Sequence, residues 1–237
     1  MKRLQIRTTT LSLVLTLAAW TSGCESQLDN KVSAKTAPAS QTKADASEAS
    51  DSKAKAEKTV PAEAVAKANV DSKGHVLDAS RSQISFVGAK VTGDHEGGFK
   101  MMKGTLRGTV EKPESFEIEV DMGSLWSDAE KLTAHLKNED FFEIERFTSS
   151  GFKSTSMVAK ASEGTTHEIS GDLSLHGVTK QITFPATIEV NGKEARGKAE
   201  FKINRKDFGI EYQGMADNAI KDEVLLKIDL AFVPATS

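Results

Sequence analysis

The sequence predicts an all-β protein, an antiparallel β-barrel of about eight strands with one or two short helices. Apolar and polar residues alternate in many short segments, as expected where one face of a strand is buried and the other meets water. Short turns join these segments, without the helical crossovers that parallel strands require. We favour a closed barrel, because an open sheet would leave two unpaired edges that invite aggregation.

The alternation assigns eight segments to strands. In the clearest of them, Ile118 and Val120 alternate with acidic residues. Two tight-turn signals, His176-Gly177 and Asn191-Gly192, indicate hairpins between neighbouring strands. The expected strands are residues 83–86, 105–111, 116–122, 148–158, 169–175, 181–190, 198–204 and 224–233.

One helix and one loop interrupt the strands. Ser127 and Glu130 form a Ser-x-x-Glu capping box, which predicts the start of a helix that Asn138 can end. Phe141 and Phe142 cannot both face inward on one strand, so we expect them to plug one end of the barrel. Residues 93–98 are polar and rich in glycine, which is typical of a loop.

Small residues fall on the inward-facing positions of several expected strands: Gly88, Gly108, Gly171 and Ala199. They could leave room inside the barrel, since an eight-stranded barrel either fills with side chains or holds one small ligand. Alternatively, the glycines mark bends in curved strands. The sequence leaves both interpretations open.

The N-terminus has the features of an export signal. Three basic residues precede an apolar run over residues 11–20, which is too short to span a bilayer. Small residues then lead to Cys24, the only cysteine, in an arrangement that resembles a bacterial lipoprotein box. We expect residues 1–23 to be removed and Cys24 to be lipidated, which would anchor an exported protein to the membrane in the periplasm or cell envelope. An ordinary cleavable signal is the alternative.

The rest of the chain divides into a predicted disordered tether, residues 24–73, and a barrel domain, residues 74–237. The tether is rich in Ala, Ser, Lys and Glu and lacks aromatic residues, so it cannot bury enough apolar surface to offset the entropy lost on ordering. Residues 1–23 hold three basic residues and no acidic ones, so their removal changes the formal net charge from −3 to −6. A mildly acidic protein argues against nucleic acid as a partner.

Three segments of the chain have distinctive sequences: residues 135–142 (HLKNEDFF), 171–180 (GDLSLHGVTK) and 201–210 (FKINRKDFGI). In this order they are similar to the HLxSxDFF motif, the GxLTxxGVTK hairpin and the FxIxRxDFGI strand end of the YceI-like family of bacterial periplasmic lipid-binding proteins, which the chain resembles. The similarity covers nearly all of residues 74–234. The resemblance implies a lipocalin-like barrel that binds a long polyisoprenoid, such as an isoprenoid quinone or polyprenyl lipid, or a related amphiphile.

Such a ligand requires an elongated apolar cavity with a few polar groups at its mouth. We expect inward-facing apolar residues to line that cavity, although each could also be plain core filling. No residue is expected to be catalytic, and no cofactor is expected beyond a bound isoprenoid lipid. The expected lining residues are Phe86, Leu106, Ile118, Val120, Phe141, Phe142, Phe184, Phe201, Ile228 and Phe232.

The remaining polar residues favour a binding protein over an enzyme. The five histidines are dispersed along the chain, so no metal site is expected. His135 is expected on a helix surface, with contact to a ligand head group as the alternative. Arg205 and Asp207 are expected to form an ion pair that shapes a bend, with the same alternative.

A different class of function is also compatible with the sequence. A structural or interaction lipoprotein would have a filled barrel and would bind another envelope protein through its loops or outer face. The polar segment 93–98 and the long tether motivate this alternative. The volume of the barrel interior discriminates between the two.

Overall fold

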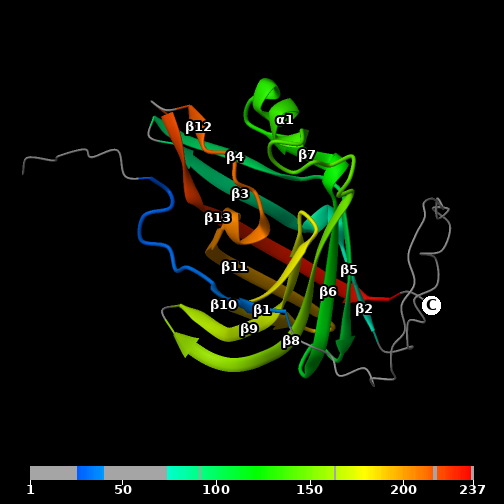
Figure 1. Cartoon of the computed structure of the whole chain (residues 1–237). Coiled ribbons are helices and arrows are strands. Elements are labelled where there is room, and N and C mark those ends of the chain that lie inside the picture. The colour runs from blue at the N-terminus through cyan, green and yellow to red at the C-terminus, as the bar shows by residue number, and fades with distance from the viewer. Residues whose placement is uncertain (1–25, 40–73, 91, 163, 216–217, 236–237) are drawn as a thin grey trace, which may run out of the picture.

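The computed structural model describes residues 26–39, 74–90, 92–162, 164–215 and 218–235. The predicted export signal and Cys24 lie outside these ranges. The described chain is mostly β, with a closed eight-stranded antiparallel barrel and one short α-helix, which confirms the predicted fold class (Figure 1). No described helix combines the length and apolar composition that crossing a bilayer requires.

The elements have the following order along the chain. They are β1 (Lys35–Pro38), β2 (His75–Leu77), η1 (Ala79–Arg81), β3 (Gln83–Lys90), β4 (Gly93–Phe99), β5 (Met102–Gly108), β6 (Pro113–Asp121), η2 (Met122–Ser124), β7 (Leu125–Ser127), α1 (Glu130–Lys137), β8 (Ser149–Ser162), β9 (Thr165–Leu175), β10 (Val178–Asn191), β11 (Glu194–Asn204), η3 (Arg205–Phe208), β12 (Gly214–Met215) and β13 (Asn218–Pro234).

The barrel wall closes in the order β2-β5-β6-β8-β9-β10-β11-β13, and β13 pairs with β2 to complete the ring. Strands β3, β4 and β7 extend the wall, since β3 pairs with β13, β4 with β3, and β7 with β4. Each therefore continues a barrel strand: β3 continues β2, β4 precedes β5, and β7 follows β6. Helix α1 lies at this extended end of the barrel, beside β7 (Figure 1).

Of the two predicted hairpin turns, the first lies where the sequence predicts it and the second lies one residue later. His176 and Gly177 have φ values of 51° and 74°, the backbone of a type I′ turn, and they bring Leu175 opposite Val178. In the second hairpin Asn191 still belongs to β10 and pairs with Glu194, so the turn residues are Gly192 and Lys193, with a φ of 62° at Gly192. These turns set the register in which the alternating apolar residues share the inner face of the wall.

Residues 93–98 form most of strand β4, so the predicted loop is wrong. The glycines here allow close packing. A Cβ at Gly97 would lie 2.5 Å from Cζ of the Phe86 ring, and a Cβ at Gly98 would lie 2.7 Å from the carbonyl oxygen of Ile84. Glycine is therefore required here by close packing against residues that are distant in sequence. A local sequence pattern for a loop contains no information about such neighbours.

Helix α1 begins without the predicted capping box. Its N-cap is Ala129, which makes no side-chain cap bond. Ser127 belongs to β7, and its hydroxyl shares a hydrogen bond of 2.9 Å with Thr133 Oγ1 instead. The prediction was wrong because pairing of β7 with β4 holds Ser127 in a strand, too far from the first helical residue. Asn138 ends the helix as predicted.

Residues 26–39 lie against the barrel, so the predicted tether is wrong for this part of residues 24–73. Strand β1 pairs with β10, and the Leu28 side chain is only 1% exposed. Leu28 packs on the outer face of the wall with Val87, Ala89 and Leu225. The prediction rested on the average composition of residues 24–73, which cannot show that a single leucine fits a single apolar site on the barrel. Residues 40–73 lie outside the described residues.

Gly171 and Gly197 should respond differently to the same substitution. A Cβ at Gly171 would lie 2.3 Å from Cζ of Phe152, whereas a Cβ at Gly197 would meet no atom within 4 Å. We expect Gly171→Ala to lower the free energy of unfolding by about 1–3 kcal/mol, because the core around it is already filled. Gly197→Ala should leave it unchanged or raise it by up to about 1 kcal/mol. Urea unfolding of both variants measures the difference, and equal losses would contradict this packing.

Candidate functional site

A cavity of about 270 Å³ lies inside the barrel, and its lining is almost entirely apolar. Its wall comes from β3, β4, β5, β6, β8, β9, β10, β11 and β13, while α1 and residues 141–142 border one end. Because side chains alternate across a strand, every second residue of each strand can face this space. The volume lies close to the lower end of the range for ligand sites, which is about 300–1,000 Å³.

All ten residues that the sequence predicts as lining border this cavity. Eight of them are buried, and Phe142 and Ile228 are partly exposed. Their location follows from the alternation, because each belongs to the apolar face of its strand or to the Phe141-Phe142 pair. Their contact with a ligand stays a prediction.

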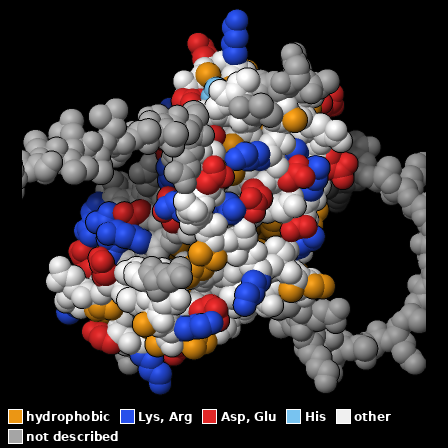
Figure 2. Space-filling view, turned by 90° about the vertical axis from the view of Figure 1, so that its left-hand side faces the viewer, with side chains coloured by type: hydrophobic (Ala, Val, Ile, Leu, Met, Phe, Trp, Pro, Cys, Tyr) orange, Lys and Arg blue, Asp and Glu red, His pale blue; other side chains and the backbone are white. Residues whose placement is uncertain are grey.

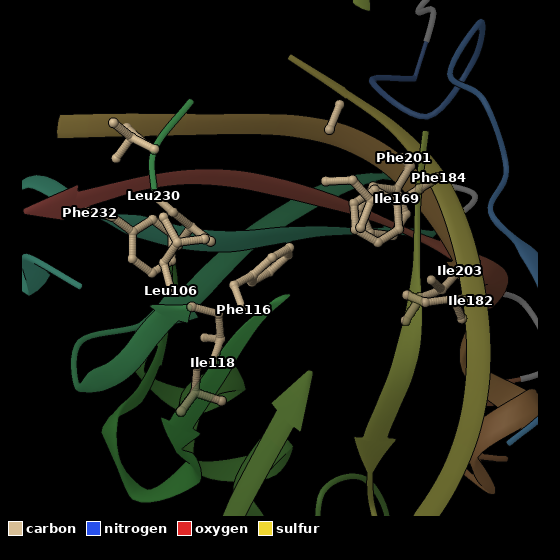
Figure 3. Packing of buried hydrophobic residues seen from close by; sticks show 14 of the residues in the cluster. Leu106, Phe116, Ile118, Ile169, Ile182, Phe184, Phe201, Ile203, Leu230 and Phe232 are labelled. Atoms are coloured by element: carbon tan, nitrogen blue, oxygen red, sulfur yellow. The ribbon is translucent and has the colours of Figure 1, made fainter. Parts of the chain in front are cut away.

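Phenylalanine rings supply much of the lining. Phe184 and Phe201 are stacked, with centroids 4.1 Å apart and planes 12° apart, and Phe152 lies 5.6 Å from Phe184. Phe116 bridges this group to the other side of the interior, 5.4 Å from Phe152 and 6.3 Å from Phe232. Figure 3 shows the Phe184–Phe201 pair and the Phe116–Phe232 pair on different walls. Their flat faces offer the wide apolar contact that suits a hydrocarbon chain.

Phe141 and Phe142 lie at the end of the cavity beside α1. Phe142 meets Phe86 in an edge-on contact with centroids 6.3 Å apart. The backbone N–H of Phe142 donates to the carbonyl oxygen of Leu136 over 3.2 Å, which ties the segment to the helix. Both rings border the cavity because the segment is not a strand, where neighbouring side chains would face opposite ways.

A few polar groups border the cavity as well. Lys90 and His95 lie near the turn between β3 and β4, and His95 Nδ1 is 3.0 Å from Oδ1 of Asp128. Arg196 and Lys198 border the cavity from β11. An apolar space with few polar groups is the arrangement that suits an amphiphilic ligand.

His135 lies in an aromatic cluster on α1. Its ring makes edge-on contacts with Phe141 at 5.2 Å and Tyr212 at 5.0 Å, and Nε2 is 3.5 Å from Oδ2 of Asp140. This agrees with the helix-surface interpretation. Among the described residues, no three His, Cys, Asp or Glu side chains lie together as metal ligands would.

Arg205 shapes the bend after β11, but the predicted ion pair with Asp207 is wrong. The Arg205 side chain is buried and donates to the carbonyl oxygen of Ile210 over 2.6 Å and to Asp222 Oδ1 over 3.2 Å. Burial lowers the pKa of its guanidinium, and the charge of Asp222 opposes that shift. Asp207 instead pairs with Lys180. In the 3₁₀ turn of η3, residues two apart point to different sides, which separates Arg205 from Asp207.

Arg205 and Lys206 allow a matched test, because both contact Asp222. Arg205→Met leaves the carbonyl oxygen of Ile210 without its donor in a buried site, so we expect the free energy of unfolding to fall by about 1–3 kcal/mol. Lys206→Met removes an exposed ion pair and should cost less than about 1 kcal/mol. Urea unfolding compares the two, and similar losses would show that burial does not set the difference.

Sequence reasoning missed part of the lining. Ile169, Ile182 and Ile203 are buried and border the cavity. The sequence does contain a pattern that places them on the inner face, because Ile182 alternates with Phe184, and Ile203 with Phe201, on the same faces of their strands. Those pairs could have been found by extending the alternation along each strand.

The small inward residues have different roles. Gly88 and Ala199 border the cavity, and a Cβ at Gly88 would meet no atom within 4 Å. The Phe152 ring occupies the space at Gly171. Gly108 has a φ of 86° at the irregular end of β5. Gly88 and Ala199 therefore fit the interpretation of space for a ligand, and Gly108 fits that of a bend.

Comparison with known proteins places this barrel in a family. The model of the YceI-like domain matches residues 75–232. A UPF0312 protein of Pseudomonas fluorescens is 34% identical over 139 residues, which cover 55% of this chain and 71% of that protein. A UPF0312 protein of Pseudomonas putida is 34% identical over 132 residues, which cover 52% of this chain and 68% of that protein.

Two solved structures share the fold. BcnA of Burkholderia cenocepacia is 22% identical with a TM-score of 0.59, covering 68% of this chain and 99% of that chain. A polyisoprenoid binding domain from Saccharophagus degradans, implicated in plant cell wall breakdown, is 18% identical with a TM-score of 0.57, covering 68% of this chain and 98% of that chain. Because the family match extends from β2 into β13 and so spans the whole barrel, this chain belongs to the YceI-like domain family.

Proposed function

We propose that this protein holds or carries a polyisoprenoid-type lipid, an isoprenoid quinone or a polyprenyl chain, in the barrel interior. The observation that carries the proposal is the apolar cavity enclosed by the barrel wall. Burial of hydrocarbon contributes about 0.8 kcal/mol per CH₂ group, so such a lining favours an apolar tail. The polyisoprenoid binding domain from Saccharophagus degradans, which has the same fold, supports the ligand class.

The cavity volume limits how much of the tail this conformation can hold. A CH₂ group has roughly the size of a water molecule, about 30 Å³, so a volume of 270 Å³ holds about nine carbon groups, or roughly two isoprene units. Two units would contribute roughly 8 kcal/mol before the costs of association are subtracted. A longer chain would have to widen the cavity or extend beyond it.

A chain-length series tests this proposal. We expect the affinity for isoprenoid alcohols to rise steeply up to about two isoprene units and more slowly beyond, because later units find less preformed space. Titration calorimetry with prenol, geraniol, farnesol and geranylgeraniol, which contain one to four isoprene units, measures the trend, with linear alcohols of equal carbon number as controls. Organic extraction of the protein purified from its host, followed by mass spectrometry, identifies the natural ligand. An empty barrel that also binds none of the series would refute the proposal.

The alternative function, an interaction lipoprotein with a filled barrel, has less support. It requires an interior packed with side chains, whereas open space lies beside Gly88 and Gly197. Segment 93–98, which motivated a loop-mediated contact, is paired as part of β4. Both observations favour the lipid-binding proposal.

We further propose that the protein acts in the bacterial cell envelope, anchored through lipidated Cys24. This part rests on the sequence motif, since Cys24 lies outside the described residues. On detergent phase separation, Cys24→Ser should move the protein from the detergent phase to the aqueous phase, because the variant lacks the acyl chains that hold the protein at a bilayer. Metabolic labelling with radioactive palmitate provides the control. Equal partitioning of both forms would favour an ordinary cleavable signal.

A further inference from the structure

Strands β10 and β11 separate over part of their length. Among the described residues, their pairing covers only residues 187–191 and 194–198. Beyond this point β10 pairs with β9 on one edge, and β11 pairs with β13 on one edge. The two edges that face each other there are not paired directly, so the barrel wall is discontinuous at this place.

Residues 32–38 lie in this opening and bond to both edges. Strand β1 pairs with β10 in antiparallel fashion. On the other side, the N–H of Ala34 donates to the carbonyl oxygen of Lys202 and the N–H of Lys202 donates to that of Val32, both over 2.8 Å. The segment therefore replaces direct β10–β11 bonds. Figure 1 shows it in blue, running down the side of the barrel to β1 beside β10.

The contacts that hold this segment are mostly at the surface. Leu28 is its only buried residue within residues 26–39. Lys31 pairs with Glu200, and Asp29 pairs with Lys221, but these side chains are between 38% and 51% exposed. Exposed ion pairs stabilise little, so the attachment rests on one buried leucine, a short backbone ladder and the hydrogen bonds of Ser26 and Gln27 to Asp94. Such a segment can detach while the barrel stays folded.

A groove on the outside reaches the same part of the wall. It has a volume of about 770 Å³ and lies between the segment and the outer faces of β3, β9, β10, β11 and β13. Phe184, Ala199 and Ile228 border both this groove and the inner cavity, so the wall between the two spaces is one layer thick. Figure 2 looks onto this side of the molecule, where acidic and basic side chains are interspersed.

We propose that the lipid tail enters and leaves the cavity sideways, between β10 and β11, and that residues 26–38 form a latch over this opening. The inference rests on the proposed lipid-binding function. Detachment of the latch frees the edges of β10 and β11. Rotation of the Phe184 ring away from Phe201 then joins the outer groove to the cavity. The α1 end is a less favourable route, because Phe141 is buried there and its neighbour is tied to the helix by a backbone bond.

A reversible cross-link tests the latch. The parent is the full chain with Cys24→Ser, which has no other cysteine. Adding Ala37→Cys and Gln181→Cys to it places two thiols opposite each other on β1 and β10. Uptake of a farnesyl chain that carries a nitrobenzoxadiazole fluorophore is followed by stopped-flow fluorescence. We expect oxidation to slow uptake at least about tenfold, because the latch can then no longer leave β10, and a reductant to restore it. The equilibrium affinity should stay within about twofold, because a gate changes rates and not the bound state.

Three controls separate this inference from the proposed function. Gln181→Cys alone controls for loss of the glutamine. A second disulfide, from Lys103→Cys and Glu119→Cys across β5 and β6, staples the wall elsewhere and should leave uptake unchanged. Leu28→Asp detaches the latch and should speed uptake several-fold. Unchanged rates in both the latch cross-link and Leu28→Asp, with normal affinity, would overturn the lateral route. Loss of binding in the Cys24→Ser parent would instead overturn lipid binding itself.

Discussion

Gly88→Leu should abolish lipid binding and leave the barrel folded. Gly88 borders the cavity, and a Cβ there would meet no atom within 4 Å, so a leucine side chain can extend into the open space. It would fill a large part of the 270 Å³ that the tail needs. A ligand at one hundred times its Kd stabilises the native protein by about 2.7 kcal/mol. We expect saturating farnesol to raise the unfolding midpoint of the unsubstituted protein and to leave that of Gly88→Leu unchanged.

A leucine on the outer face provides the matched control. Lys103 lies on β5 with its side chain 60% exposed, so Lys103→Leu adds the same side chain outside the barrel. This variant should keep the full shift with farnesol. If Gly88→Leu binds farnesol as tightly as Lys103→Leu does, the ligand does not occupy the cavity. Circular dichroism of both variants excludes loss of fold as the reason.

Phe201→Ala should lower the free energy of unfolding by about 3–5 kcal/mol, the range for phenylalanine truncated in a packed core. The Phe201 side chain is 1% exposed and stacked on Phe184, so the substitution removes buried apolar surface and one ring of the stack. Urea unfolding gives the loss directly. The enlarged cavity should also favour longer tails. In calorimetry, Phe201→Ala should therefore lower the affinity for geranylgeraniol less than it lowers the affinity for geraniol.

Phe142→Ala is the informative comparison. Phe142 borders the same cavity but is partly exposed beside α1, so its truncation should cost less stability than that of Phe201. A smaller loss of stability with a comparable change in affinity would separate ligand contact from core packing. If Phe142→Ala and Phe201→Ala lose equal stability, Phe142 is packed as tightly as Phe201, which would contradict its position at a partly exposed end of the barrel.

The fold and the lining could be predicted because both depend on a short-range pattern. Side chains alternate across every strand, so Ile118 and Val120 share a face whatever pairs with them. The turn residues His176 and Gly177 set the register of β9 and β10 in the same local way. The Phe141-Phe142 pair could also be placed, because two adjacent bulky residues are incompatible with one face of a strand.

The features that could not be predicted depend on partners distant in sequence. Gly97 signals a loop locally, but in the structure it makes room for the Phe86 ring. Ser127 lies in a capping motif, but pairing with β4 takes it out of the helix start. Arg205 has an acidic residue two positions away, but the turn directs it to Asp222.

The barrel interior and the N-terminal segment show the same difference between features set by a local pattern and features set by distant partners. The alternating strands, the apolar barrel interior and the residues that face it could be predicted from the sequence alone. The cavity that the interior retains, and the closure of the gap between β10 and β11 by residues 32–38, became visible only in the folded structure. The reason is physical. Alternation is set by the geometry of one strand, whereas residual volume and strand separation depend on how all walls meet.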